Sequence, residues 1–132
     1  MRFLRWMLCT GLCACAYEPA TYPPTPVPSG TSSQVITILN YTFSPQHLVV
    51  TPGSTVLVLN DDPVEHTVTS EATAGSYVFG GVGGIAFDTG PFLGVAAFGI
   101  AADAPPGTVV PYFCGMHLSA MLNQGEIEIA GP

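Results

Sequence analysis

The sequence predicts an all-β protein built as a sandwich or a barrel. From residue 35 onward, short β-branched or alternating segments recur, and turns rich in Gly and Pro separate them. No stretch combines helical periodicity with capping residues. The 132 residues suit a single folded domain, and an apolar fraction of 48% can supply its core. Many short strands at regular spacing are typical of sandwiches and barrels.

Six segments carry the strand signals. They are residues 34–43, 47–62 (two strands joined by a Thr-Pro-Gly-Ser turn), 66–70, 95–102, 104–114 and 125–130. The last is the clearest, because Ile127 and Ile129 alternate with two glutamates and should face inward. Residues 75–90 are rich in glycine, and we expect a loop with short extended pieces there.

The charge pattern excludes nucleic acid as a partner. The chain has two basic residues, Arg2 and Arg5, against nine acidic ones, and its formal net charge is −7. Binding to phosphate backbones or anionic lipid heads requires positive charge, which residues 6–132 lack. A protein partner with a positively charged docking face is the better match.

The first fourteen residues are predicted to be an export signal. A positive segment, MRFLR, precedes an apolar stretch of nine residues, too short to span a bilayer. LCAC at residues 12–15 resembles the lipobox of bacterial lipoproteins, with cleavage before Cys15 and acylation of its thiol. An ordinary signal peptide cut a few residues later is the alternative. Both predict an exported protein, in the periplasm or at the cell surface.

Residues 15–34 are predicted to form the acylated Cys15 and an extended tether. This segment is rich in Pro, Ser and Thr and has no apolar periodicity. A proline-rich chain of this length reaches about 60 Å at ~3.1 Å per residue. The lipid is then the only membrane contact, and residues 35–132 form the folded domain.

Cysteine usage singles out Cys114. Cys9 and Cys13 leave with the signal and Cys15 takes the lipid, so Cys114 has no disulfide partner in the mature domain. In an oxidising compartment, a lone thiol is expected to be buried or ligated. Core packing alone is the simpler explanation, and the neighbouring residues argue against it.

The segment YFCGMHLSAM, residues 112–121, gathers soft metal ligands. Cys114, His117 and Met121 are spaced so that a strand followed by a tight loop brings their side chains to one point. Thiolate, imidazole and thioether together favour copper, and two His, one Cys and a weak axial Met make the blue-copper pattern. The second imidazole must come from His66, which begins a strand, or from His47, better explained as a surface residue.

Residues 35–130 resemble the small cupredoxins, the group of plastocyanin, amicyanin, pseudoazurin and azurin. The resemblance rests on VITILNYTFSPQHLVVTPGSTVLVLNDDPVEHTVTS, on FDTG and on GTVVPYFCGMH, in the family's order. It implies a Greek-key β-sandwich with one type 1 copper ion. The implied ligands are His66, Cys114, His117 and the axial Met121.

Two features depart from the family pattern. Gly125 lies four residues after Met121, whereas in relatives the corresponding glycine usually lies two residues after the axial methionine. The ligand loop is therefore enlarged or differently shaped. Thr67 stands where several relatives have Asn, which changes the hydrogen bonding expected around the loop. Met116, between Cys114 and His117, is expected to point outward.

The resemblance implies a monomeric one-electron carrier between exported redox partners. A copper carrier or storage module that delivers the ion without redox cycling is the main alternative. An enzyme is not expected, because multicopper chemistry needs more imidazoles and His47 is the only spare one. A Cys–His hydrolase lacks an orienting group. A sandwich without metal is the remaining possibility.

Overall fold

The computed structural model of the chain describes residues 34–121 and 125–131. The predicted signal (1–14) and all but the last residue of the predicted tether (15–34) lie outside these ranges. Within the described residues, no helix has the length and apolar character needed to cross a membrane.

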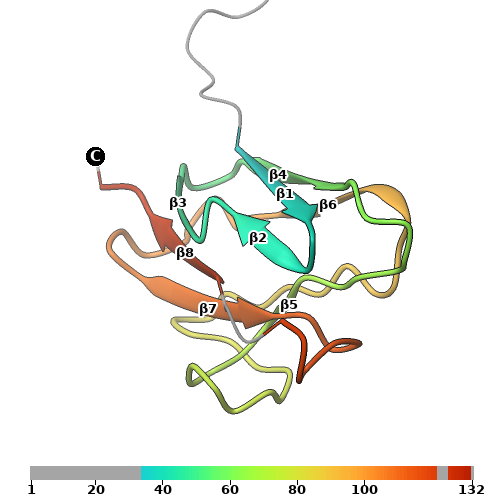
Figure 1. Cartoon of the computed structure of the whole chain (residues 1–132). Helices are drawn as coiled ribbons and strands as arrows, with labels where there is room; N and C mark the ends of the chain where they lie inside the picture. The colour runs from blue at the N-terminus through green and yellow to red at the C-terminus, as the bar shows by residue number, and fades with distance from the viewer. Residues whose placement is uncertain (1–33, 122–124, 132) are drawn as a thin grey trace, which may run out of the picture.

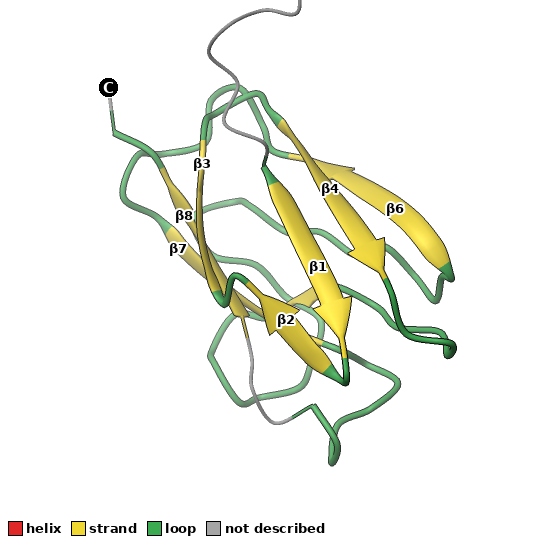
Figure 2. Cartoon of the chain, turned by 45° about the horizontal axis from the view of Figure 1, so that its top comes forward, coloured by secondary structure: helices red, strands yellow, loops and turns green. Residues whose placement is uncertain are grey.

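The described chain forms two four-stranded sheets that pack face to face (Figures 1 and 2). One sheet has the strand order β2-β1-β4-β6 and the other β3-β8-β7-β5. The strands are β1 (Val35–Leu39), β2 (Thr42–Ser44), β3 (His47–Val50), β4 (Thr55–Asn60), β5 (Thr69–Ser70), β6 (Gly94–Gly99), β7 (Val109–Phe113) and β8 (Gly125–Ile129). The predicted all-β sandwich is confirmed.

Both sheets are mixed. β1 pairs with β4 in parallel and β3 pairs with β8 in parallel, while the remaining named pairs are antiparallel. From β2 to β7, every connection passes from one sheet to the other. Loops therefore gather at the two ends of the sandwich, and the end beyond Phe113 of β7 holds the predicted ligand loop.

Alternating apolar residues build the core between the sheets. Side chains at every second position of β1, β4, β7 and β8 are fully buried and belong to one cluster: Ile36, Ile38, Val56, Val58, Val110, Tyr112, Ile127 and Ile129. In β8, Glu126 and Glu128 point away from this cluster, as the sequence pattern predicted. Burial of this alternating set holds the strand register, since a slip by one residue would expose it.

Two predicted strands differ in detail from the structure. Residues 34–43 form a hairpin, because Asn40 and Tyr41 adopt positive φ angles of 52° and 58° between Leu39 and its cross-strand partner Thr42. Such a two-residue turn follows the natural twist of a hairpin. Of residues 66–70, only the last two form a strand.

Candidate metal centre

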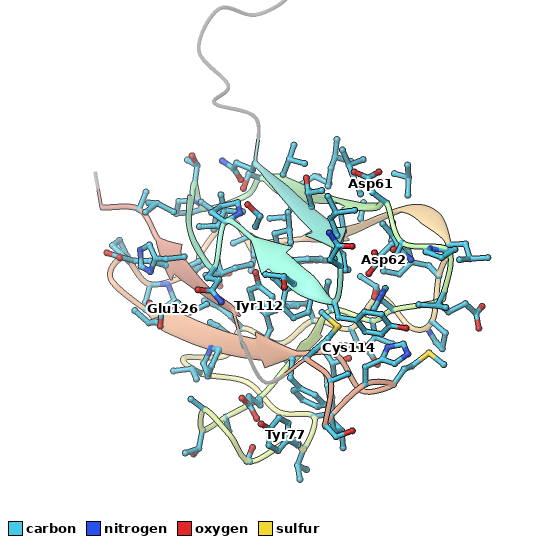
Figure 3. All side chains as sticks on the ribbon, viewed as in Figure 1. Asp61, Asp62, Tyr77, Tyr112, Cys114 and Glu126 are labelled. Carbon is cyan, nitrogen blue, oxygen red and sulfur yellow. The ribbon has the colours of Figure 1, made fainter. Side chains whose placement is uncertain are left out.

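Three of the predicted ligands converge at one end of the sandwich. Cys114 directly follows β7, and His117 lies three residues further along the loop. His66 comes from the opposite half of the chain, where its backbone pairs with Phe92 through hydrogen bonds of 3.2 and 3.0 Å. The ligand atoms of His66, Cys114 and His117 all lie within 4.8 Å of one another. Figure 3 shows Cys114 at this end.

The separation of the donor atoms fits a shared metal ion. The Sγ atom of Cys114 lies 3.6 Å from Nδ1 of His66 and 3.6 Å from Nδ1 of His117. Metal bonds of ~2.0 Å to nitrogen and ~2.3 Å to sulfur, opened by ~120°, place two donors about 3.7 Å apart. A thiolate with two imidazoles in this arrangement suits copper or another soft to borderline ion.

Consecutive turns bring Met121 back toward the same end of the sandwich. The amide of His117 donates to the carbonyl of Cys114 at 3.4 Å, and the amide of Met121 donates to the carbonyl of His117 at 2.8 Å. Met121 is 1% exposed and joins Cys114 in the core cluster. Its burial at the end of the ligand loop is what an axial thioether requires, while residues 122–124, the source of the extra loop length, lie outside the described chain.

The site is buried on one side and open on the other. His66 and Cys114 are 0% and 1% exposed, whereas His117 is only partly buried. Met116 and Leu118, which flank His117 in the chain, are 47% and 43% exposed. The outward orientation expected for Met116 agrees with this exposure. His117 is therefore the predicted ligand nearest to the surface.

Thr67 joins the two halves of the site. Its amide donates to Sγ of Cys114 at 3.4 Å, and its hydroxyl accepts the amide of Gly115 at 2.8 Å. The same hydroxyl lies 2.9 Å from that of Thr69, which in turn donates to Asp88 at 3.0 Å. Hydrogen bonds to a ligating sulfur orient it and tune its metal. Thr67 thus provides a link between the His66 segment and the ligand loop.

Asp62 contacts His66 from inside the protein. In the sequence Asp62 lies next to Asp61 and three residues before Glu65, both exposed, but Asp62 itself is only 8% exposed and its Oδ2 lies 2.9 Å from Nε2 of His66. Burial alone would raise the pKa of Asp62, but hydrogen bonds from the amides of Tyr41 and Asn40 and from His66 outweigh it and lower that pKa. The carboxylate stays ionised. Figure 3 shows Asp61 and Asp62 together near the end of β4.

Burial governs the charge of His66 itself. It lowers the pKa of His66 more than the bond to Asp62 raises it, and the nearby His117 adds to the lowering. His66 is therefore neutral at pH 7. Because the Asp62 carboxylate can only accept a hydrogen bond, the ring proton of His66 is on Nε2. Nδ1 is then unprotonated and faces Cys114 with a lone pair available for a metal. A metal needs the imidazole in this form.

Tyr41 completes the surroundings of both histidines. Its ring meets the ring of His66 edge-on at a centroid distance of 5.3 Å and that of His117 at 5.0 Å. The two imidazoles lie 4.7 Å apart. Tyr41 is 37% exposed, so it forms part of the surface beside His117.

His47 takes no part in this cluster. Its Nδ1 lies 2.7 Å from Glu126 and its Nε2 lies 3.0 Å from Glu128, both on the outer side of β8. In Figure 3, Glu126 lies at the left of the molecule and Cys114 lies to the right of centre. The prediction that His47 is a surface residue is confirmed, and His66 is the histidine that lies with Cys114 and His117.

Two contributors to the site went unrecognised as such in the sequence, Tyr41 and Asp62, whereas Thr67 was expected to affect the hydrogen bonding of the loop and does bond to Cys114 and Gly115. The only signal for Asp62 was its position four residues before His66. The pattern gave no sign that Tyr41, 25 residues before His66, would reach it. Cys15, the predicted lipid site, lies outside the described residues.

Known structures share this architecture. An oxidised amicyanin variant superposes with a TM-score of 0.55 at 19% identity, over 75% of this chain and 83% of that one. A purple cupredoxin from Nitrosopumilus maritimus gives 0.51 at 23% identity, over 73% and 98%. The chain has the cupredoxin fold. A copper-containing nitrite reductase from Thermus scotoductus also matches, with a TM-score of 0.51 at 18% identity, over 74% of this chain but 22% of the enzyme.

Comparisons based on sequence alone find no relative of this chain. No protein-family model matches the chain, and neither does any curated protein sequence. The resemblance drawn from the residues is therefore confirmed by the structural neighbours. At these identities the likeness covers the fold, and the case for a ligand set rests on the geometry of this chain's own residues.

Proposed function

We propose that this protein is a type 1 (blue) copper protein that carries one electron at a time between exported redox partners. The observation that supports it most is the convergence of three donors, with both imidazole Nδ1 atoms 3.6 Å from the Cys114 sulfur. His66, Cys114, His117 and Met121 would hold the copper ion. When bound, copper supplies a one-electron couple.

The protein's contribution is a site formed before the metal arrives. His66 is held by Asp62, Cys114 by the amide of Thr67, and the loop by its consecutive turns. A site held in this way changes little between two oxidation states, which is the requirement for fast electron transfer. Cys114 belongs to the buried apolar cluster of the core, which keeps water from the inner side of the site.

His117 is the proposed route for the electron. It is the most exposed of the three clustered donors, and Tyr41, Met116 and Leu118 offer an apolar rim around it. Redox partners dock through small interfaces with electrostatic steering. The exposed carboxylates Asp61 and Glu65 and the absence of Lys and Arg beyond Arg5 favour a partner with a positively charged face.

An enzymatic role is not part of the proposal. Among the described residues, the cluster of His66, Cys114 and His117 is the only group of three or more His, Cys, Asp or Glu side chains arranged to hold a metal. His47 is occupied by two glutamates. No second copper centre for substrate chemistry is evident in the described chain.

Copper delivery is the competing function, and Met121 separates the two. Met121→Leu removes the sulfur at similar volume. An electron carrier should keep its copper and cycle at a raised potential, because the oxidised ion loses a donor. A delivery site should lose copper to a chelator in the variant and yield it to an apo-acceptor in the wild type. Voltammetry and chelator competition on both proteins measure these outcomes.

The proposed setting is outside the cytoplasm, with Cys15 as a lipid anchor. This rests on the residue pattern of the first fifteen positions. Cys15→Ser should release the protein from the membrane fraction, because acyl chains contribute ~0.8 kcal/mol per buried CH₂ to attachment. A Ser variant that stays with the membrane would require another anchor.

A further inference from the structure

We propose that Asn40, Tyr41 and Asp62 act as one positioning unit that orients both histidine ligands and lowers the reduction potential of the site. The inference builds on the proposed function, since it concerns the same ligands. None of the three residues is itself a ligand; each acts through His66 or His117.

The Asp62 carboxylate is the centre of this unit. Its Oδ1 accepts the amide of Asn40 at 2.7 Å, and its Oδ2 accepts the amide of Tyr41 at 2.9 Å and Nε2 of His66 at 2.9 Å. One buried charge therefore holds the β1–β2 turn and a predicted ligand together. Bonds to an ionised acceptor are about twice as strong as neutral ones.

The turn that Asp62 holds is strained. Tyr41 has a φ of 58°, in a region that bulky residues rarely occupy and that persists where surrounding contacts impose it. The two hydrogen bonds from the backbone amides of Asn40 and Tyr41 to Asp62 are such contacts. With the turn held in this way, the Tyr41 ring lies edge-on against the rings of both His66 and His117.

Each histidine is positioned by a different part of the unit. His66 has its Nε2 proton assigned by Asp62, which directs Nδ1 toward the Cys114 sulfur. His117 has no hydrogen bond beyond its own loop and Cys114 among the described residues, so its ring is supported by contacts with the rings of Tyr41 and His66. A fixed negative charge behind His66 also stabilises the more positive, oxidised ion.

Two substitutions at Asp62 separate its hydrogen bond from its charge. Asp62→Asn keeps an oxygen for His66 and Tyr41 but removes the charge and turns an amide nitrogen toward the Asn40 amide, whereas Asp62→Ala removes the oxygen as well. Glu71→Gln is the matched control. Glu71 is a fully buried carboxylate that holds a loop through Gly75, Ser76 and Tyr77 and contacts no predicted ligand.

The first measurement uses the metal-free protein. Nitrogen-15 NMR of the His66 ring should show the proton on Nε2 in the wild type, in Asp62→Asn and in Glu71→Gln, and a mixture of tautomers in Asp62→Ala. An unchanged tautomer in a folded Asp62→Ala protein would overturn the positioning role. Because no copper is involved, this outcome is independent of whether the proposed function holds.

The second measurement is the reduction potential of the copper-loaded protein. Asp62→Asn should favour the reduced form at least tenfold, a rise of about 59 mV for a one-electron couple, and Glu71→Gln should shift it much less. Equal shifts in both would contradict a specific effect of Asp62.

Tyr41 is tested by the rate of copper loss to a chelator. Tyr41→Leu should speed it several-fold, while Tyr41→Phe, which keeps the ring, should restore the wild-type rate. Equal rates in all three proteins would remove Tyr41 from the unit.

Discussion

Gly125 provides the sharpest test of the packing next to the ligand loop. A Cβ atom added there would lie 2.0 Å from Cζ, 2.2 Å from Oη and 2.5 Å from Cε2 of Tyr112. Ordinary carbon contacts are ~3.5–4.0 Å, so the ring or the strand must move by roughly 1.5 Å. Tyr112 is fully buried and packs edge-on against Phe43 at 5.0 Å, and these contacts restrict its movement.

The expected cost of Gly125→Ala is therefore at the upper end for overpacked cores. Such substitutions lose about 1–3 kcal/mol, and more where neither partner can move. β8 is paired on both sides, by β3 and by β7, so its backbone is held as well. We expect Gly125→Ala to lower the free energy of unfolding by ~3 kcal/mol in urea titrations of the metal-free domain.

Gly99→Ala is the matched control for this experiment. Gly99 lies in β6, and a Cβ added there meets no atom within 4 Å. Its substitution should change stability by less than ~0.5 kcal/mol. A loss below ~1 kcal/mol for Gly125→Ala, or equal losses in the two variants, would refute the packing described for Tyr112.

Three further predictions concern single side chains. Tyr112→Phe removes a buried hydroxyl that has no hydrogen-bond partner within the described structure. The free energy of unfolding, measured by urea titration, should therefore rise by about 1 kcal/mol. A decrease would contradict this prediction. The pKa of His47 is raised, chiefly by its hydrogen bond to Glu126, so this bond stabilises the fold fully below about pH 6.5 and loses its effect as pH rises through the raised pKa. The difference in urea midpoint between the wild type and His47→Gln should therefore shrink as pH rises. A difference that does not depend on pH would refute this. Leu118→Lys should slow electron transfer to a partner with a positively charged docking face, because the new charge repels it, while leaving the potential nearly unchanged. An unaltered rate in stopped-flow mixing would remove Leu118 from the rim.

Local patterns were enough to predict most of the fold. Alternation in residues 125–130 correctly placed Ile127 and Ile129 in the core. The turn at Asn40 and Tyr41 was missed because neither residue is glycine, the usual choice where both φ angles are positive. Here hydrogen bonds from a distant carboxylate hold the turn, and a local pattern carries no such information.

The same distinction applies to the metal centre. Residue type and spacing predicted the cluster of His66, Cys114 and His117, because soft donors are rare in this chain. The residues that orient them could not be predicted in this way. Asp62 resembles one more surface carboxylate until the fold buries it against His66, and although Thr67 was expected to affect the loop, its bonds to Gly115 and Cys114 depend on the fold.

The optical spectrum of the oxidised, copper-loaded domain tests the central claim most directly. A thiolate bound to Cu(II) produces an intense visible charge-transfer band, so we expect a strongly coloured protein. Cys114→Ser should abolish that band while circular dichroism shows the β-sandwich unchanged. A colourless wild-type protein, or a band that survives in Cys114→Ser, would contradict the assignment of Cys114 as the copper ligand.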